Sequence, residues 1–443
     1  MKGNLIGRKE STNNTISISM VIYLFCFLFA PPVLPINFVI ILSIYSFIML
    51  LSVYKNRVIV IIEKSYIKKF TVSYIVFALY WILIVMMNFA WGERIMLSNY
   101  VTILYQMVLI TPIMASCISY IIVRSEKLCF SLEQLLVHVI LAGTIEGIIS
   151  LIMFISPAIR QMLVRIMERG MGMNFENYIL SRRVYGFANG VYDLFGWGTG
   201  LIAVLPLFLS KKLRKRYIWL IPLLLLPPLL NARTGLVMFA AGVVVFMVFL
   251  NNENIFTLSK KVLLLFLGGL ISYRIFKWIQ DKNATSYTWI LEGIKSFWGT
   301  ISNNQDTDLR LTTLFSKGFW TTPPFPDIIF GTGHNIYIGR AYAHSPIINY
   351  SHSDVGYINY LWMGGIVGSL TLYGIYYSLF YIAIRNTVDR NNRWLLILFG
   401  GSIVLFNIKG QAFTHCPATA MIFTILFYSL YLGRKDQQMK NEI

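Results

Sequence analysis

Acidic residues are scarce in this chain. Its 443 residues include 19 Asp and Glu against 38 Lys and Arg, and charged residues of all kinds make up only 13%. Hydrophobic residues make up 56%, which excludes a disordered chain and is typical of an integral membrane protein. The basic excess would suggest nucleic acid in a soluble protein. In a membrane protein it has a topological explanation, so no nucleic-acid partner is predicted.

Cysteine is also scarce, and its placement excludes two kinds of small scaffold. The four cysteines are Cys26, Cys117, Cys129 and Cys416. No two of them form a Cys-x-x-Cys pair, so neither a disulfide framework nor a zinc site is indicated. A small-residue cleavage site is missing too, because the first apolar run leads into Pro31, Pro32 and Pro35. We therefore expect an uncleaved first helix.

Long apolar runs dominate the chain and predict its fold class. A helix needs about 20 mostly apolar residues to cross the hydrocarbon core of a bilayer. Such runs predict about twelve transmembrane helices, at residues 16–34, 36–54, 70–90, 100–123, 132–155, 191–210, 217–231, 235–250, 262–279, 355–384, 394–410 and 414–432. We therefore expect an all-α polytopic membrane protein with a single integral membrane domain, 1–443. Three prolines in the run 217–231 predict a kink, or a hairpin with the next run.

The positions of Lys and Arg predict the orientation. Every short loop on the side of the N-terminus is basic, as cytoplasmic loops of membrane proteins are. These residues are Lys2, Arg8, Lys9, Lys55, Arg57, Lys64, Lys68, Lys69, Arg124, Lys127, Lys211, Lys212, Arg214, Lys215, Arg216, Lys260, Lys261, Arg385, Arg390, Arg393, Arg434, Lys435 and Lys440. Both termini are therefore expected in the cytoplasm. Two sizeable loops, 156–190 and 281–353, are then external.

The first external loop has arginines and no lysine. Its basic residues are Arg160, Arg165, Arg169, Arg182 and Arg183. External loops are normally poor in positive charge, and arginine is preferred where phosphate or carboxylate is bound by several hydrogen bonds. For the first three arginines a second interpretation stays open, in which Pro157 to Arg169 is an amphipathic segment lying on anionic headgroups. For Arg182 and Arg183, a role in a site is favoured.

Three ionisable residues are expected at membrane depth. Arg233 lies in Asn231-Ala232-Arg233-Thr234-Gly235, where two apolar runs meet on the external side. A cation there needs a partner or ligand unless it snorkels to the headgroups. Asp193 follows Arg182 and Arg183 closely enough to pair with one of them, and Glu146 is a second acid within an apolar run. Each is a functional candidate, although a structural ion pair explains either acid equally well.

The second external loop ends in Ser351-His352-Ser353-Asp354 at the mouth of a helix. His352 can act as a general base near neutral pH. Asp354 can orient it, or can cap the following helix instead. The histidines His334, His344 and His352 lack a metal-ligand spacing, so no metal is predicted. Further cations in this loop include Arg310 and Arg340.

In its order of motifs the chain resembles the bacterial O-antigen polymerases (Wzy type) and O-antigen ligases. Arg182-Arg183-Val184-Tyr185-Gly186-Phe187 resembles the family's arginine, glycine and aromatic entry to a mid-chain helix. Asn231-Ala232-Arg233-Thr234-Gly235-Leu236 resembles its Ser-Arg-Thr-small-Leu helix start. The likeness continues through Arg310, Pro326, Gly331-Thr332-Gly333, His352 and Gly364-Gly365-Ile366-Val367-Gly368. One departure is Trp362-Met363, which stands where the family often has an acidic residue.

The resemblance implies a membrane glycosyltransferase of the GT-C type that uses neither a metal nor a nucleotide sugar, and hence no cofactor. The implied reaction polymerises repeat units linked to polyprenyl pyrophosphate at the periplasmic face of a bacterial inner membrane. Implied partners are the lipid-linked donor and acceptor, membrane lipid and a chain-length regulator protein. An O-antigen ligase, which moves the glycan to lipid A core, is the closer alternative. A lipid-linked oligosaccharide flippase is the more distant one, and a purely structural membrane protein leaves the arginine-only loop unexplained.

The resemblance also implies roles for particular residues. Arg183, Arg233 and Arg310 would bind the pyrophosphate, because charge-assisted hydrogen bonds can stabilise a leaving group without a metal. His352 would deprotonate the attacking hydroxyl, oriented by Asp354. The secondary candidates are Arg182, Asp193, Arg340 and His344.

Overall fold

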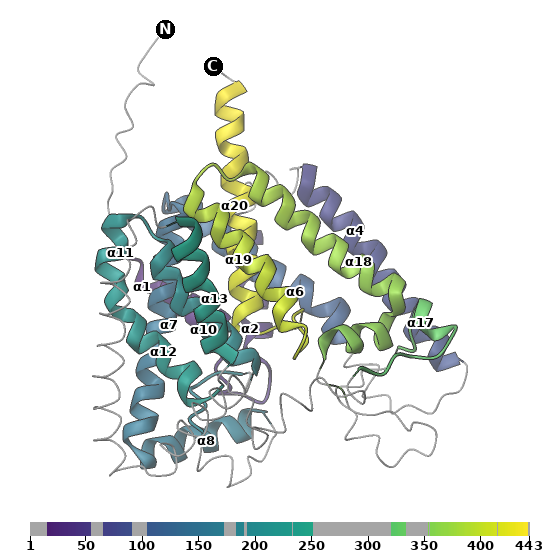
Figure 1. Cartoon of the computed structure of the whole chain (residues 1–443), viewed down its shortest axis with the longest axis horizontal. Helices are drawn as coiled ribbons and strands as arrows, with labels where there is room; N and C mark the ends of the chain where they lie inside the picture. Colours follow the sequence, from purple (N-terminus) through teal and green to yellow (C-terminus); the bar gives the residue numbers. More distant parts are fainter. Residues whose placement is uncertain are drawn as a thin grey trace.

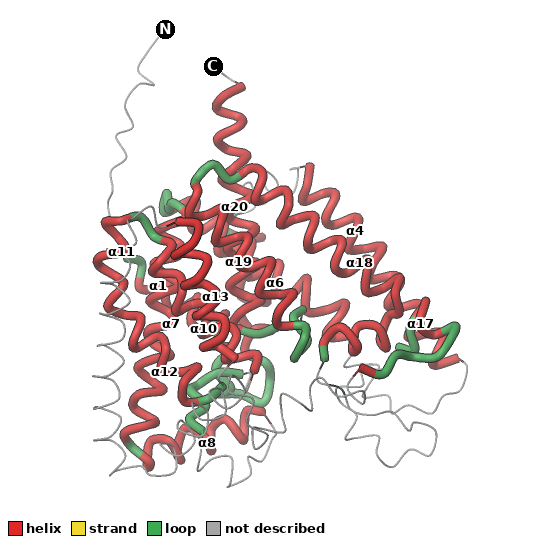
Figure 2. Tube along the Cα trace, in the orientation of Figure 1, coloured by secondary structure: helices red, strands yellow, loops and turns green. Residues whose placement is uncertain are grey.

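The computed structural model describes residues 16–54, 65–90, 104–171, 183–189, 193–232, 234–250, 320–333, 353, 355–413 and 415–441. Within these ranges the chain is helix and loop, with no strand (Figure 2). The predicted all-α class is therefore confirmed for the part of the chain that the structure describes. Each predicted apolar run that falls on described residues contains a helix, whereas the run 262–279 lies outside them.

The helices follow one another along the chain as shown in Figure 1. They are α1 (Ile18–Phe29), α2 (Phe38–Ser52), α4 (Ser65–Ala90), the π-helical η1 (Tyr105–Leu109), α6 (Ile110–Lys127), α7 (Leu132–Ile155), α8 (Pro157–Met171), α10 (Asp193–Phe208), α11 (Lys211–Tyr217), the 3-10 turn η2 (Ile218–Leu220), α12 (Ile221–Leu230), α13 (Thr234–Val245), the π-helical η3 (Phe246–Leu250), α17 (Asp327–Phe330), α18 (Gly356–Asn386), α19 (Arg390–Phe406) and α20 (Pro417–Asn441).

Local sequence explains where several of these helices begin and end. Ser131 and Gln134 form a capping box at the start of α7, which satisfies two backbone N–H groups that have no partner inside the helix. The Asp389 side chain caps α19 by accepting from the Asn392 N–H at 2.8 Å. Helix α1 ends because Ala30, which follows its last residue, has a left-handed backbone conformation and is followed by two prolines.

Helix α10 lies at the centre of the bundle and packs against α7, α12, α13, α19 and α20. Two glycines allow its closest approach: a Cβ on Gly200 would lie 2.1 Å from the Gly235 carbonyl oxygen on α13. Trp197 of α10 stacks on Phe406 of α19, with ring centroids 4.4 Å apart. The predicted hairpin is present, because α12 and α13 are joined by three residues and pack together.

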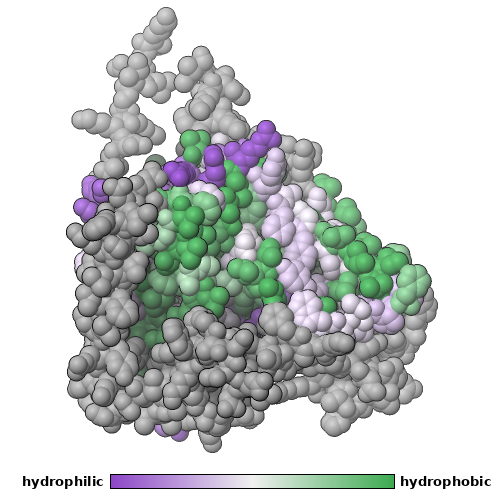
Figure 3. Space-filling model, in the orientation of Figure 1, coloured by the Kyte–Doolittle hydropathy of each residue, from purple (hydrophilic) through white to green (hydrophobic). Residues whose placement is uncertain are grey.

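The two ends of the bundle differ in charge. One end, called the basic end here, carries cations in the connections between helices: Arg124, Lys127, Lys211, Lys212, Arg214, Lys215, Arg216, Arg385, Arg390 and Arg393. Contacts between these connections place them together. Arg124 donates to Ser19 at the start of α1, and Arg390 donates to the Phe249 carbonyl at the end of η3. In Figure 3 the hydrophilic residues of the visible face gather near this end, and apolar residues cover the helices beyond it.

Two of the described helices, α7 and α18, are long and apolar enough to cross a membrane. Six further apolar helices have 10–17 residues. Several helices also turn large apolar side chains outward. On α4 the exposed residues are Val72, Ile75, Val76, Leu79, Leu83 and Met86. Their spacing of three and four residues forms a continuous stripe on one helix face.

Candidate functional site

The end of the bundle opposite to the basic end is called the distal end here, and the two described residues of the predicted site, Arg183 and Asp193, lie there. Helices α1, α7, α12 and α19 end there, and α10, α13 and α18 begin there (Figure 1). Of the predicted site residues, Arg183 and Asp193 are described. The remaining ones lie outside the described residues: Arg182, Arg233, Arg310, Arg340, His344, His352 and Asp354. Among the described residues, Ala232 and Thr234 lie on either side of Arg233, and Ser353 and Val355 lie on either side of Asp354.

The segment 183–189, which starts with Arg183, crosses the ends of α1 and α12 and lies against α7 at Glu146. Its backbone N–H groups donate from Val184 to the Leu230 carbonyl of α12 at 3.2 Å and from Asn189 to the Phe29 carbonyl of α1 at 2.7 Å. Between them, the Phe187 N–H donates to Glu146 Oε1 of α7 at 2.8 Å. Three helices therefore fix the backbone that follows Arg183.

Glu146 is fully buried beneath this segment. Gly186, with φ of +69°, lies so close that a Cβ there would be 1.8 Å from Glu146 Oε1. The second carboxyl oxygen, Oε2, has no hydrogen-bond partner among the described residues. The carboxyl group therefore helps to fix the backbone of the 183–189 segment, because it accepts the hydrogen bond from the Phe187 N–H. This explains an acid in an apolar helix, which the sequence could only mark as a candidate.

The residues on either side of Arg233 lie beside the start of α10. Thr234 Oγ1 donates to the Asp193 carbonyl at 3.3 Å, and Asn231 Nδ2 donates to the Tyr185 carbonyl at 3.4 Å. A Cβ on Gly196 would lie 2.5 Å from the Ala232 carbonyl oxygen, so the two backbones are in close contact. The structure thus brings the motif around Arg183 and the motif around Arg233 together, although they are about 50 residues apart.

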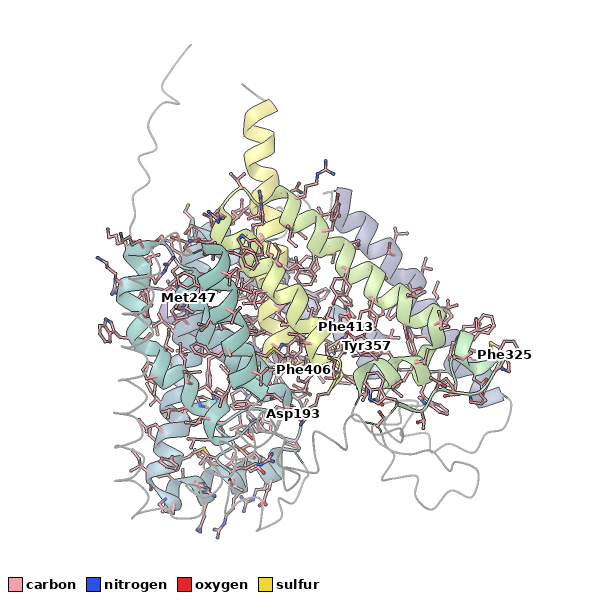
Figure 4. The ribbon with its side chains drawn as sticks, viewed as in Figure 1. Asp193, Met247, Phe325, Tyr357, Phe406 and Phe413 are labelled. Carbon is pink, nitrogen blue, oxygen red and sulfur yellow. The ribbon has the colours of Figure 1, made fainter. Side chains whose placement is uncertain are left out.

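The start of α18, just after His352 and Asp354, fits into the connection between α19 and α20. The Tyr357 N–H donates to the Asn407 carbonyl at 3.2 Å, and the Phe413 N–H donates to the Tyr360 hydroxyl at 2.9 Å. A Cβ on Gly356 would lie 2.0 Å from the Gly410 carbonyl oxygen. Figure 4 shows Tyr357, Phe406, Phe413 and Asp193 in this part of the molecule.

The α19–α20 connection, residues 407–416, joins the motifs, and sequence reasoning missed it. Lys409 Nζ lies 3.5 Å from Asp193 Oδ2, in a pair whose side chains are 38% and 36% exposed. His415 Nε2 lies 3.2 Å from the Phe27 carbonyl oxygen of α1. The predicted helices 394–410 and 414–432 wrongly included most residues of this connection. The available signal was the polar island Asn407-Ile408-Lys409-Gly410-Gln411 between two apolar runs.

A second contact ties part of the long loop to α18. The residues 331–333 pair with a break in this helix at Gly365, where φ is +62°. The Thr332 N–H donates to the Trp362 carbonyl at 2.7 Å, and the Gly333 N–H donates to the Met363 carbonyl at 3.0 Å. Tyr80 of α4 donates to the Phe330 and Gly364 carbonyls, both at 2.8 Å.

The described part of the distal end carries two cations, and its described residues form no metal-binding cluster. Arg183 and Lys409 supply positive charge near the starts of α10 and α13, and Arg183 is only partly buried. Among the described residues there is no group of three or more His, Cys, Asp and Glu that could hold a metal ion. The chemistry available from these residues is therefore hydrogen bonding and charge stabilisation of an anionic group.

No model of a known protein family, no curated protein and no solved structure matches this chain.

Proposed function

We propose that the chain is a polytopic membrane glycosyltransferase that polymerises oligosaccharide repeat units linked to polyprenyl pyrophosphate. The observation that carries the proposal is the meeting of three sequence motifs at the distal end. The segment after Arg183, the residues flanking Arg233 and the start of α18 after His352 surround the starts of α10 and α13 and the 407–416 connection. A flippase moves its substrate across the membrane, so it would not require three polar motifs to meet at one end of the bundle.

The proposed location is the inner membrane of a bacterium, with about twelve spans and both termini in the cytoplasm. The outward apolar stripe of α4 supports a lipid-facing surface, because soluble proteins rarely expose contiguous apolar patches of this kind. The basic end has the charge expected on the cytoplasmic side. The distal end is then periplasmic, and the predicted loops 156–190 and 281–353 belong to that side.

In the proposed reaction, a sugar hydroxyl of one lipid-linked repeat unit attacks the anomeric carbon of a growing glycan. The bond from this carbon to the pyrophosphate oxygen breaks, and polyprenyl pyrophosphate leaves with the electron pair. Arg183, Arg233 and Arg310 bind the leaving group, with Arg182 and Arg340 as secondary cations. His352 accepts the hydroxyl proton, and Asp354 orients it. Asp193, through Lys409, holds a further cation beside the same helix starts.

The test is a lipopolysaccharide gel from cells in which this gene is deleted and then restored. Wild type is expected to give a ladder, whereas Arg233→Ala and His352→Ala are expected to give lipid A core with one repeat unit. Arg216→Ala, an arginine at the basic end, is the matched control and should leave the ladder intact. Immunoblots of the membrane fraction confirm that each variant accumulates.

Other outcomes decide between the alternatives. Core without any repeat unit in the deletion strain would indicate the ligase or the flippase. A full-length ladder with Arg233→Ala would refute the pyrophosphate clamp. A normal ladder with His352→Ala would show that another group accepts the proton.

A further inference from the structure

The helix α8 presents one of its arginines to the protein interior. Arg160, Val164 and Met167 share one helix face, at a spacing of four and three residues, and all three are buried. Arg165 and Arg169 lie on the opposite face and are exposed. The two interpretations of these arginines therefore separate: the exposed pair can lie on headgroups, whereas Arg160 occupies a position that the helix pattern would assign to an apolar residue.

The described surroundings of Arg160 contain no charge that balances it. Only 9% of the residue is exposed, and its neighbours on the same face pack with Met153, Phe154, Val184, Tyr185 and Leu230. Tyr185 interacts electrostatically with the guanidinium group, and burial lowers the pKa of Arg160. Among the described residues, Arg160 has no carboxylate partner within ion-pair distance and no side-chain hydrogen bond.

An arginine stays charged even when its pKa is lowered by burial, because the ordinary value is above 12. A buried charge without a counter-charge is strongly destabilising, so it is normally paired or occupied by a ligand. Here the protein supplies no counter-charge among its described residues. The guanidinium fork matches the oxygens of a phosphate group better than any other common anion except carboxylate.

Apolar side chains lie exposed beside Arg160. They are Ile155 at the end of α7 and Ile159, the residue before Arg160 on α8. Helix α8 forms the distal face of the bundle (Figure 1). In the proposed orientation this places a cation just below the headgroup level of the outer leaflet, next to apolar residues that acyl chains can cover.

We propose that Arg160 binds the phosphate group of a lipid of the outer leaflet. The same chemistry fits two sources, an anionic phospholipid of the bilayer and a polyprenyl phosphate carrier. The inference rests on the proposed membrane location and is independent of glycosyl transfer.

The test compares Arg160→Met with Arg165→Met in the purified full-length protein. Tryptophan fluorescence reports the melting temperature in neutral detergent with added dioleoylphosphatidylglycerol, undecaprenyl phosphate or dioleoylglycerol. The last lipid has no phosphate and is the control. Wild type and Arg165→Met are expected to gain several degrees with a phosphate lipid. Arg160→Met should bind it about 10- to 100-fold more weakly, because a charge-assisted pair is lost.

The lipid-free melting temperature separates a ligand site from a structural role. Arg160→Met should melt at or above the wild-type temperature without lipid, because it removes a buried unbalanced charge. A marked loss in lipid-free detergent, with the phosphate-lipid shift retained, would overturn the proposal. So would an equal shift with dioleoylglycerol. If Arg160→Met does not accumulate, Arg160→Lys keeps the charge without the fork and should show a reduced shift.

The two phosphate lipids identify the source. A shift with phosphatidylglycerol that Arg160→Met abolishes assigns the site to bilayer lipid, and a shift only with undecaprenyl phosphate assigns it to the carrier. Because this readout does not involve polymerisation, a negative gel result for the proposed function leaves it interpretable.

Discussion

Glu146 offers the sharpest test of how the distal end is held together. Its carboxyl oxygen accepts the Phe187 N–H at 2.8 Å and lies against Gly186, three residues after Arg183. In Glu146→Ala this N–H loses its acceptor in a largely buried place, which costs about 1–3 kcal/mol. If the whole loss falls on the position of Arg183, the proposed polymerisation should slow by about 5- to 150-fold, since each 1.4 kcal/mol is a factor of about ten.

Two variants distinguish the acceptor from the charge and from the space it fills. Glu146→Gln keeps a carbonyl oxygen in the same place, so it should retain most of the activity. Ser150→Ala, one helical turn further on α7, removes a buried hydroxyl that has no partner among the described residues, and it should be neutral. The assay is the lipopolysaccharide ladder, with the melting temperature of the purified protein as the stability readout.

The reasoning would be refuted by a full wild-type ladder in Glu146→Ala. It would also be refuted if Glu146→Gln were as inactive as Glu146→Ala, because the negative charge rather than the acceptor would then be required.

Two further predictions concern packing and pH. Gly200→Ala should strongly destabilise the protein, because the new Cβ would lie 2.1 Å from the Gly235 carbonyl oxygen, whereas Gly401→Ala, with nothing within 4 Å, should be neutral or stabilising; melting temperatures check both. Burial lowers the pKa of His415, in the 407–416 connection, to about 4. Since the unfolded value is about 6.5, the unfolded chain binds the proton first, so stability is unaffected above that pH and falls between about 6.5 and 4. His415→Gln, which can still donate to the Phe27 carbonyl, should lose less melting temperature between pH 7 and pH 4.5 than wild type; an equal loss would contradict this assignment.

The helices could be predicted from the sequence because a bilayer-length apolar run leaves the backbone few alternatives. The segment from Pro157 to Arg169, for which an amphipathic helix was one of two open interpretations, forms α8. The face that each of its arginines occupies was not predicted. That depends on α7 and the 183–189 segment, whose positions are set by contacts between distant residues.

The connections were harder to predict than the helices. The 407–416 connection was hidden because Ile408 and the apolar residues on either side extend the neighbouring runs. The partner of Asp193 was expected among the arginines before it, and the structure pairs it with Lys409, more than 200 residues later. The glycines 364, 365 and 368 belong to the stretch in which the chain resembles the polymerase and ligase family. Gly364 and Gly368 approach Trp81 and Tyr80 of α4. The break at Gly365 depends on hydrogen bonds from residues 332 and 333, which are distant in the sequence, so the sequence does not reveal it.

That break has a consequence for how the long external loop can vary. Opening α18 at Gly365 frees the Trp362 and Met363 carbonyls from the helix ladder, and residues 332 and 333 occupy them with their own N–H groups. Two of the hydrogen bonds that hold the loop against α18 are thus donated by backbone N–H groups, which every residue but proline possesses. Substitutions of side chains at residues 332 and 333, proline excepted, should therefore leave these two hydrogen bonds to α18 in place.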